Sequence, residues 1–370
     1  MTDRLSVSRL EQFASCPYRH FIDYGLRPVQ QDSFTFESND AGTFFHEALD
    51  RYMKRAGADS RWPGFTPEQV DDVLEPILAE LTEEWKDSPL QGDALGEWTG
   101  EGYVRRVRRA AHVLTRFAAN SDFRTIATEQ SFGQGVMPPL TLRLADGSRT
   151  EIKGIIDRID TYENGEGIWL RVVDNKSAFK KPEPAKMADG EQLQLMIYLK
   201  AAGQAYPGSR PAGAMFFPIQ DPEIPAEDET PGAAEAERLK KVRMKGIVNA
   251  REDVLHAMDR DVRPCSVDDI FNKDGSVRKG VNWAVEENVL QGLMDAAEQK
   301  ATEICGEIRS GRIEPLPRGK GEEDSPCRYC SYRTLCRRNG EPAHPREEGI
   351  TFRDIAREAA GKITLREDEK

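Results

Sequence analysis

The chain has 370 residues, of which 38% are hydrophobic, so it should bury a sizeable core as one large domain or two small ones. No run of about 18 apolar residues occurs, and the first residues lack the apolar segment of a signal peptide, which predicts a cytoplasmic protein without a membrane span. The formal net charge of −12 argues against a surface that wraps duplex DNA, because affinity for phosphate comes mainly from Lys and Arg.

A first helix is predicted at the start of the stretch 5–23. Ser6 or Ser8 can cap it, and apolar residues follow at helical spacing. Cys16 and Pro17 stand where this helix should end. A lone cysteine is more often a small buried hydrophobic residue than a ligand.

A second helix is predicted to begin at Thr43, a residue type that caps helices. An apolar stripe follows it, made of Phe44, Phe45, Ala48, Leu49 and Tyr52. His46 then falls in the first turn, close to the stripe. It is therefore either a core histidine bonded to backbone or a ligand.

Two further helices are predicted over 66–85 and 103–120. Thr66 starts the first with a capping box, followed by Pro at the first helical position. We expect residues 50–120 to form a helical insertion packed beside a sheet. The basic run RRVRR at 105–109 either lines a DNA channel or forms a solvated helix face balanced by acidic neighbours.

Strands are predicted over 126–132, 140–144, 149–158 and 212–219, with a hairpin turn at Asp146-Gly147. Two apolar runs on either side of Asn164-Gly165 predict a further β-hairpin. A polar loop should follow Lys176, then a helix over 191–205. One long helix is predicted over 281–311.

Three side chains of the Asn-Gly hairpin suggest chemistry. Asp157 lies in its first strand, and Asp174 and Lys176 lie near the end of the second. Paired strands would bring these groups to one end of one sheet. Converging carboxylates repel each other unless a cation lies between them, and oxygen ligands suit Mg²⁺ or Mn²⁺. A lysine two residues further on can then polarise a water or a phosphate oxygen.

The helix over 191–205 carries polar residues within an apolar sequence. Gln194 and Tyr198 form an i, i+4 pair on one face, whereas Gln192 lies apart from this pair and would serve the site separately. Buried polar groups need partners, so these residues are expected to point towards a site.

Cys327, Cys330 and Cys336 have the spacing C-x2-C-x5-C. Closely spaced thiols in a chain that lacks a secretion signal favour metal binding over disulfides. Zinc would need a fourth ligand, for which Cys16 and His344 are candidates. Two other cysteines, Cys265 and Cys305, are expected to be plain thiols.

These strings resemble the PD-(D/E)xK nucleases of the RecB type. An acid on one strand and (D/E)-x-K on the next are the core motif, matched by GIIDRID at 154–160 and DNKS at 174–177. Asn175 stands where this group usually has Tyr. Gly42 to His46 resembles a G-x-x-x-H string, and Gln194 to Tyr198 resembles a Q-x-x-x-Y element.

The resemblance narrows to AddB subunits of AddAB helicase-nucleases, because residues 244–259 and the pairing of an N-terminal Cys-Pro with three C-terminal cysteines are similar to that group. It implies an α/β fold with a mixed sheet flanked by helices. It also implies one nuclease domain over 1–340, a cysteine segment over 313–340 and a tail over 341–370.

The resemblance also assigns roles to the candidate residues. Mg²⁺ or Mn²⁺ would be held by His46, Asp157, Asp174 and the backbone carbonyl of Asn175. Catalytic roles would fall to Asp157, Asp174, Lys176, Gln192, Gln194 and Tyr198. A four-iron, four-sulfur cluster would bind Cys16, Cys327, Cys330 and Cys336 and fasten the two ends of the chain.

The implied activity is cleavage of single-stranded DNA, on the strand processed 5′ to 3′, in double-strand break repair and recombination. No Walker A string G-x-x-x-x-G-K-[ST] occurs, so an AddA-like partner is expected to act as the motor. Two alternatives remain: a catalytically silent cluster-bearing DNA-binding subunit, and a scaffold protein stapled by zinc.

Overall fold

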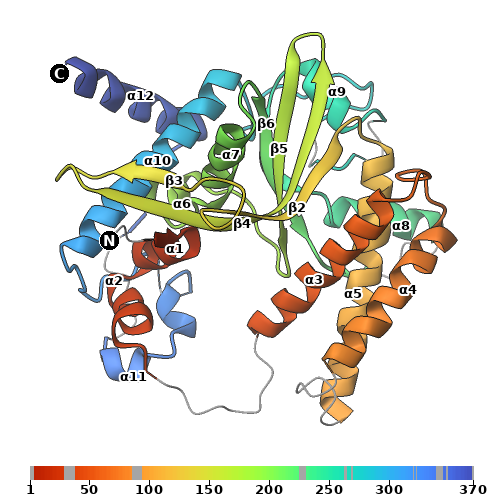
Figure 1. Cartoon of the computed structure of the whole chain (residues 1–370), viewed down its shortest axis with the longest axis horizontal. Coiled ribbons are helices and arrows are strands. Elements are labelled where there is room, and N and C mark those ends of the chain that lie inside the picture. The colour runs from red at the N-terminus through yellow and green to blue at the C-terminus, as the bar shows by residue number, and fades with distance from the viewer. Residues whose placement is uncertain are drawn as a thin grey trace.

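The fold is built on one mixed sheet of eight strands (Figure 1). The computed structural model of the chain describes residues 4–28, 38–85, 94–224, 231–261, 265–267, 270–319, 321, 323–338, 345–346 and 349–368. The strands are β1 (Arg4–Ser6), β2 (Arg124–Phe132), β3 (Leu140–Arg143), β4 (Arg149–Asn164), β5 (Gly167–Lys176), β6 (Arg210–Pro218), β7 (Lys245–Asn249) and β8 (Ala284–Val285). Their order is β1-β4-β5-β6-β7-β8, with β2 and β3 also paired to β4. The predicted α/β class with a mixed sheet is confirmed.

Helices cover both faces of this sheet (Figure 1). The α-helices are α1 (Val7–Ser15), α2 (Pro17–His20), α3 (Ser38–Gly57), α4 (Pro67–Glu84), α5 (Ala94–Ala119), α6 (Pro184–Asp189), α7 (Gln194–Ala205), α8 (Pro231–Lys241), α9 (Glu252–Met258), α10 (Glu287–Arg309), α11 (Arg333–Cys336) and α12 (Phe352–Asp368). A π-helix, η1 (Phe21–Leu26), and a 3-10 helix, η3 (Pro326–Tyr329), complete the set. Among the described helices, none is both long and apolar enough to cross a bilayer.

Strand β4 is the centre of the sheet, because it pairs with β1, β2, β3 and β5. The predicted hairpin joins it to β5, and Asn164 pairs with Gly167 across the turn. Gly167 has a φ of +123°, a conformation that favours glycine. Because Arg158 pairs with Val173, the register sets Asp157 opposite Asp174.

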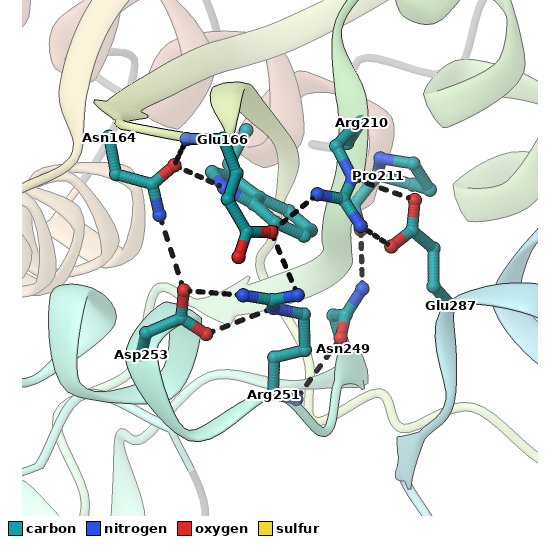
Figure 2. A network of polar contacts seen from close by, with 9 residues as sticks. Asn164, Glu166, Arg210, Pro211, Asn249, Arg251, Asp253 and Glu287 are labelled. Carbon is teal, nitrogen blue, oxygen red and sulfur yellow. Dashed lines mark hydrogen bonds and ion pairs between the residues drawn. The ribbon is translucent and has the colours of Figure 1, made fainter.

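The turn of this hairpin is fastened to β6 and α9 (Figure 2). Asn164 Oδ1 accepts hydrogen bonds from the Glu166 backbone N–H and from Trp169 Nε1. Glu166 forms ion pairs with Arg210, at 2.8 Å, and with Arg251, at 2.9 Å. Both guanidinium groups also lie over the Trp169 ring. These contacts hold the hairpin against β6 at the end remote from Asp157 and Asp174.

Two apolar clusters lie on opposite faces of the sheet. Helices α1, α7, α10 and α12 pack on one face, where Ile156, Leu170 and Val172 are fully buried. Helices α3, α4, α5 and α9 pack on the other, around Trp169 and Val173. The predicted helical insertion therefore does pack beside the sheet, and the predicted capping box of Thr66 is present at the start of α4.

The sequence prediction for α3 was wrong at its start. The helix begins at Ser38, so Thr43 lies inside it and His46 falls in the third turn. Ser, Asn, Asp and Thr all cap helices, so this stretch offers several possible starts and local preference does not choose between them. At the first helix the prediction was closer, because the Ser6 hydroxyl accepts from the Arg9 N–H and α1 ends before Cys16.

Other boundaries also differ from prediction. The polar loop after Lys176 contains α6, which has Pro184 at its first position. The helix predicted over 191–205 begins at Gln194, and α5 already begins at Ala94. The helix predicted from Val281 begins only at Glu287, because Ala284 and Val285 form β8 beside β7.

The region predicted as a C-terminal tail includes α12. Phe352, Ile355 and Ala356 of this helix are buried in the same cluster as α10. The Gln299 side chain of α10 donates to the backbone carbonyl of Ala359 at 3.2 Å. Residues 352–359 are thus part of the core, whereas His344 lies outside the described residues.

Candidate active site

The carboxylates of Asp157 and Asp174 lie at one end of the β4–β5 hairpin. They are 7% and 1% exposed. Asp157 Oδ2 accepts a hydrogen bond of 2.6 Å from the backbone N–H of Asn175. The end of β5 is thereby joined to Asp157 by a side chain, where the regular strand pairing has stopped.

His46 and Glu129 form, with Asp157, a group of three potential metal ligands. His46 Nδ1 lies 3.2 Å from Asp157 Oδ2 and 3.5 Å from Glu129 Oε1. One ligand atom from each of the three residues lies within 4.8 Å of the others. Octahedral Mg²⁺ with bonds near 2.1 Å holds its ligands about 3 to 4.2 Å apart, and the two distances from His46 Nδ1 lie in that range.

Two contacts position His46 and Glu129. The register of β2 on β4 sets Glu129 opposite Asp157, since Thr128 pairs with Arg158 and Gln130 with Ile156. One turn beyond His46 on α3, Asp50 accepts a 2.7 Å hydrogen bond from the Thr128 hydroxyl. This bond fixes α3 against β2 beside Glu129.

The charge of His46 reflects its acidic neighbours. Burial alone would lower its pKa, but hydrogen bonds with Asp157 and Glu129 outweigh that effect and raise the pKa of His46 to about 10. Without a metal ion, the ring is therefore a cation held between two carboxylates. A metal ion bound by Nδ1 would replace that proton.

Asp174 is held by residues of two elements. Gln194 Nε2 donates to Asp174 Oδ1 at 2.8 Å, and Lys176 Nζ lies 2.5 Å from Oδ2. The lysine contact is an ion pair, so each oxygen of the Asp174 carboxylate has a partner in the described part of the chain. Burial and the charge of Asp157 raise the pKa of Asp174 to about 7, against the opposing effect of Lys176.

Helix α7 delivers Gln194 and Tyr198 to this site. Gln194 Nε2 also donates to the Tyr198 hydroxyl at 3.2 Å. The start of α7 is capped by Glu11 of α1, whose Oε1 accepts from the backbone N–H groups of Leu193, at 2.7 Å, and Gln194, at 2.9 Å. The structure thus gathers all predicted site residues of the sheet, of α3 and of α7, except Gln192.

Gln192 does not join the acidic group. Its Oε1 accepts from the backbone N–H of Glu183 at 2.8 Å, and its Nε2 donates to the carbonyl of Lys181 at 3.2 Å. The side chain therefore holds the loop that follows Lys176. Its predicted direct catalytic role gains no support from this position.

The sequence prediction missed Glu129 and Glu11. Glu129 lies in a correctly predicted strand, but its place opposite Asp157 depends on a register that alternation does not reveal. It also has a φ of +45°, which is uncommon for a residue other than glycine. Glu11 lies on a predicted helix, and only the packing of α1 on α7 brings its carboxylate to the helix start.

The four predicted cluster ligands approach the junction of the two chain ends. Cys16 is 8% exposed, and its thiol pKa is raised by burial and also by the nearby sulfurs of Cys327 and Cys330. None of the cysteines forms a disulfide. Among the described residues, the His46 group is the only one with three potential ligand atoms within 4.8 Å, so the cysteine sulfurs are spread more widely.

The segment before these cysteines docks on the N-terminal helices. The Arg318 backbone N–H donates to the carbonyl of Ser15 at 3.0 Å, and its guanidinium pairs with Asp189 at 2.6 Å. The Tyr332 hydroxyl donates to Asp23. Cys265 and Cys305 are both buried thiols, as expected, and the predicted cluster on the other four cysteines stays a prediction.

Two of the four arginines in the basic run on α5 form ion pairs with carboxylates. Arg108 pairs with Glu75, and Arg109 pairs with Glu235 at 2.9 Å and Asp221 at 3.5 Å. These contacts favour the solvated face over the DNA channel.

A hairpin with an acid on one strand and D-x-K on the next, beside a histidine and a third acid, is the arrangement typical of PD-(D/E)xK nucleases. Residues 4–337 match the PD-(D/E)XK nuclease superfamily, and the chain belongs to it. The predicted family is thereby confirmed.

Several relatives are named as the B subunit of an ATP-dependent helicase/deoxyribonuclease. The protein from Moorella thermoacetica is 33% identical over 351 residues, that from Exiguobacterium sibiricum 31% over 355, and that from Thermoanaerobacter sp. strain X514 30% over 341. Each similarity covers 90% of this chain but only 30% of the relative.

Proposed function

We propose that the chain is a Mg²⁺- or Mn²⁺-dependent deoxyribonuclease that cleaves single-stranded DNA. The observation that carries this proposal is the convergence of His46, Glu129, Asp157, Asp174 and Lys176 at one end of the hairpin. Asp157 and Asp174 are buried on paired strands, and His46 Nδ1 lies 3.2 Å from Asp157 and 3.5 Å from Glu129, distances that suit ligands of a hard divalent ion.

His46, Glu129, Asp157 and Asp174 would hold the ion. The backbone carbonyl of Asn175 would join them, because N–H and C=O of one strand residue face the same neighbour and this N–H already faces Asp157. A bound ion would polarise the scissile phosphate and make an attacking water more acidic.

The protein's own groups would position the reactants. The Lys176 amine, 24% exposed beside Asp174, would orient the attacking water and stabilise the charge that develops on phosphate. Gln194 would fix the Asp174 carboxylate, and Tyr198 would support Gln194. The direct catalytic role predicted for Tyr198 is thus proposed as a supporting one.

The names of the relatives support a wider role. They combine an ATP-dependent helicase with a deoxyribonuclease, so we infer that the chain works within such an assembly, with an AddA-like protein and DNA as partners. Processing of unwound ends on the 5′ to 3′ strand, in break repair and recombination in the cytoplasm, follows from that placement.

We further propose a four-iron, four-sulfur cluster on Cys16, Cys327, Cys330 and Cys336. The close approach of the Cys16, Cys327 and Cys330 sulfurs at the junction of the chain ends supports it. Such a cluster would act as a structural staple. Zinc is the alternative, and an iron and zinc assay on anaerobically purified protein separates the two.

The nuclease proposal is tested with labelled single-stranded and duplex DNA, with Mg²⁺ and with EDTA. Asp174→Ala and Lys176→Ala should each lower the cleavage rate by at least about 10²-fold, as expected for loss of a group that stabilises the transition state. Stability should fall little or rise in Asp174→Ala, because a buried, repelled carboxylate is removed.

The label, at either the 5′ or the 3′ end, reports the polarity of cleavage. Near wild-type rates in both variants would disprove the assigned site. A wild-type protein that binds DNA but never cleaves it would instead support the silent-subunit alternative, which the unusual Asn175 motivates.

A further inference from the structure

The loop 177–183 lies directly after the catalytic Lys176 and carries an uncovered aromatic ring. Phe179 is 56% exposed, whereas Asp157 and Asp174 of the site are buried. Lys180 and Lys181 follow it in sequence. An exposed aromatic ring beside two amines is the combination that single-strand binding surfaces use, because bases stack on rings and phosphates pair with cations.

The loop is held in place by side-chain hydrogen bonds. The Gln192 amide bonds to the backbone of both Lys181 and Glu183. Glu183 in turn pairs with Lys186 at 2.8 Å. A loop fixed at its C-terminal half can present Phe179 in a set position, which reduces the entropy cost of binding.

The Lys180 side chain lies near the active site. Its Nζ lies 4.9 Å from the centre of the Phe216 ring, and Lys176 Nζ lies 5.8 Å from the centre of the same ring. Phe216 pairs with Asp174 in the sheet. The Lys180 charge is accordingly one of the influences that lower the pKa of Asp174.

Lys181 points elsewhere and is exposed. In the described part of the chain it forms no ion pair with a carboxylate. Its amine is thus available for an external anion.

We propose that loop 177–183 is the single-strand binding element of this site: Phe179 stacks on a base beside the scissile phosphate, and Lys180 and Lys181 bind neighbouring phosphates. Gln192 is a positioning residue that acts by holding the loop. This inference rests on the proposed function and deepens it, since it names the element that selects unpaired DNA. Duplex DNA has no free base face to offer to Phe179.

Binding is measured with Ca²⁺ in place of Mg²⁺, by the anisotropy of two fluorescein-labelled probes. One probe is an oligothymidylate, and the other is an oligomer of the same length whose sugars carry no bases. Phe179→Ala should weaken binding of the oligothymidylate by about 5- to 150-fold, which corresponds to the 1–3 kcal/mol of one stacked base. It should leave binding of the abasic oligomer unchanged.

The lysines should behave differently. A Lys180→Ala, Lys181→Ala double variant should weaken both probes alike and reduce the slope of log affinity against log salt by about 1.4, or 0.7 for each lost phosphate contact. Phe179→Ala should leave that slope unchanged.

Conservative variants and matched controls separate binding from folding. Phe179→Tyr keeps the ring and should bind both probes like the wild type. Gln192→Ala should lose part of the preference for the base-bearing probe, and Gln192→Glu, which keeps the acceptor for the Glu183 N–H, should lose less. Trp98→Ala, at a ring that is 66% exposed on α5, is the control for Phe179→Ala, and Lys279→Ala is the control for the lysines. Neither should change the binding of either probe.

The proposal is overturned if Phe179→Ala binds the oligothymidylate like the wild type, if it weakens both probes equally, or if Trp98→Ala has the same effect. An unchanged salt slope in the lysine double variant overturns the phosphate contacts. Since binding is read without cleavage, a base-dependent loss in a protein that never cuts DNA would reject the nuclease proposal but not this one.

Discussion

Single residues of the candidate active site are placed where a cation is needed. Asp174 is almost completely buried and lies opposite Asp157 in the register of β4 on β5, and burial together with the charge of Asp157 raises its pKa to about 7. Such an arrangement costs stability in the free protein. A bound ion would offset that cost in the working protein, because a metal ion favours the charged form of every carboxylate around it.

Glu129 tests that view, because sequence motifs do not include it. Glu129→Gln keeps the size of the side chain but removes its charge. It should lower the affinity for Mn²⁺ at least tenfold, because a tenfold loss is already typical for residues that only support a metal ligand. High Mn²⁺ should restore much of the cleavage rate. Calorimetric titration with Mn²⁺ measures the affinity.

Glu163→Gln is the matched control, since Glu163 is an exposed acid at the far end of β4, the strand that carries Asp157. It should bind Mn²⁺ like the wild type. Equal affinities in the wild type and Glu129→Gln would remove Glu129 from the site.

Asn175 departs from the usual Tyr, but its side chain should not reach the ion. Successive strand side chains alternate, so it points away from Asp174 and Lys176, and only its backbone faces Asp157. Asn175→Tyr should therefore change stability modestly and keep the metal-dependent cleavage rate within about tenfold, or roughly 1.4 kcal/mol of barrier. Rate measurements under single turnover check this.

The contrary outcome is equally clear. If the wild type is inactive and Asn175→Tyr gains activity, this position disables the site, and the silent-subunit alternative is correct.

At the scale of elements, α1 and α2 form a platform for the site. Through Glu11, α1 caps the helix that carries Gln194. His20 of α2 is 5% exposed and accepts a 2.9 Å hydrogen bond from Arg9 Nε of α1. Its ring also meets Phe13 edge-on, with the ring centres 5.3 Å apart. The two short helices thus depend on a neutral histidine between them.

This histidine predicts a pH dependence of stability. Burial, and then the charge of Arg9, lower the pKa of His20 from 6.5 to about 4, against the opposing effect of Asp23. The folded state then binds the proton more weakly than the unfolded state. The contribution of neutral His20 to the free energy of unfolding is complete above pH 6.5. It is lost as the pH falls towards 4, by about 3 kcal/mol in total.

His20→Gln keeps an acceptor for Arg9 but does not titrate. Its free energy of unfolding, measured with urea, should be lower than that of the wild type at pH 7.5, and the difference should shrink as the pH falls below 6.5. A difference that stays constant from pH 7.5 to pH 4 would show that His20 is not buried in its neutral form.

On the scale of the whole molecule, the chain ends close on each other around the sheet. Arg318 bonds to the end of α1, and the Cys327 and Cys330 sulfurs approach Cys16 from a segment separated from it by most of the chain. A cross-link between such distant segments restricts the unfolded chain strongly. The proposed cluster would therefore stabilise the entire nuclease domain.

Cys16→Ser should lose iron and visible absorbance, and Tm should fall by roughly 5 °C, the shift expected for about 2 kcal/mol in a large domain. Iron analysis and calorimetry measure both effects. Cys305→Ala is the control, because Cys305 is fully buried in the core and is not among the proposed ligands, so this variant should keep the iron of the protein. Unchanged iron content in Cys16→Ser would exclude Cys16 as a ligand.

Features that depend on neighbouring residues could be predicted from the sequence alone. The Asn-Gly hairpin, the capping box of Thr66 and the D-x-K spacing all follow from turn chemistry and side-chain period, which act over a few residues. Since the hairpin alone aligns Asp157 with Asp174, the centre of the site could be predicted.

Which distant segments meet at the active site depends on tertiary packing. Glu129 reaches Asp157 through a strand register that includes an irregularity between Thr125 and Ala127, and Glu11 reaches α7 through helix packing. Gln192 was assigned to the site by its position in sequence, but its side chain binds the loop instead. Alternation and periodicity specify the face of an element but not its partner, because partner and register are chosen by the burial of the whole core.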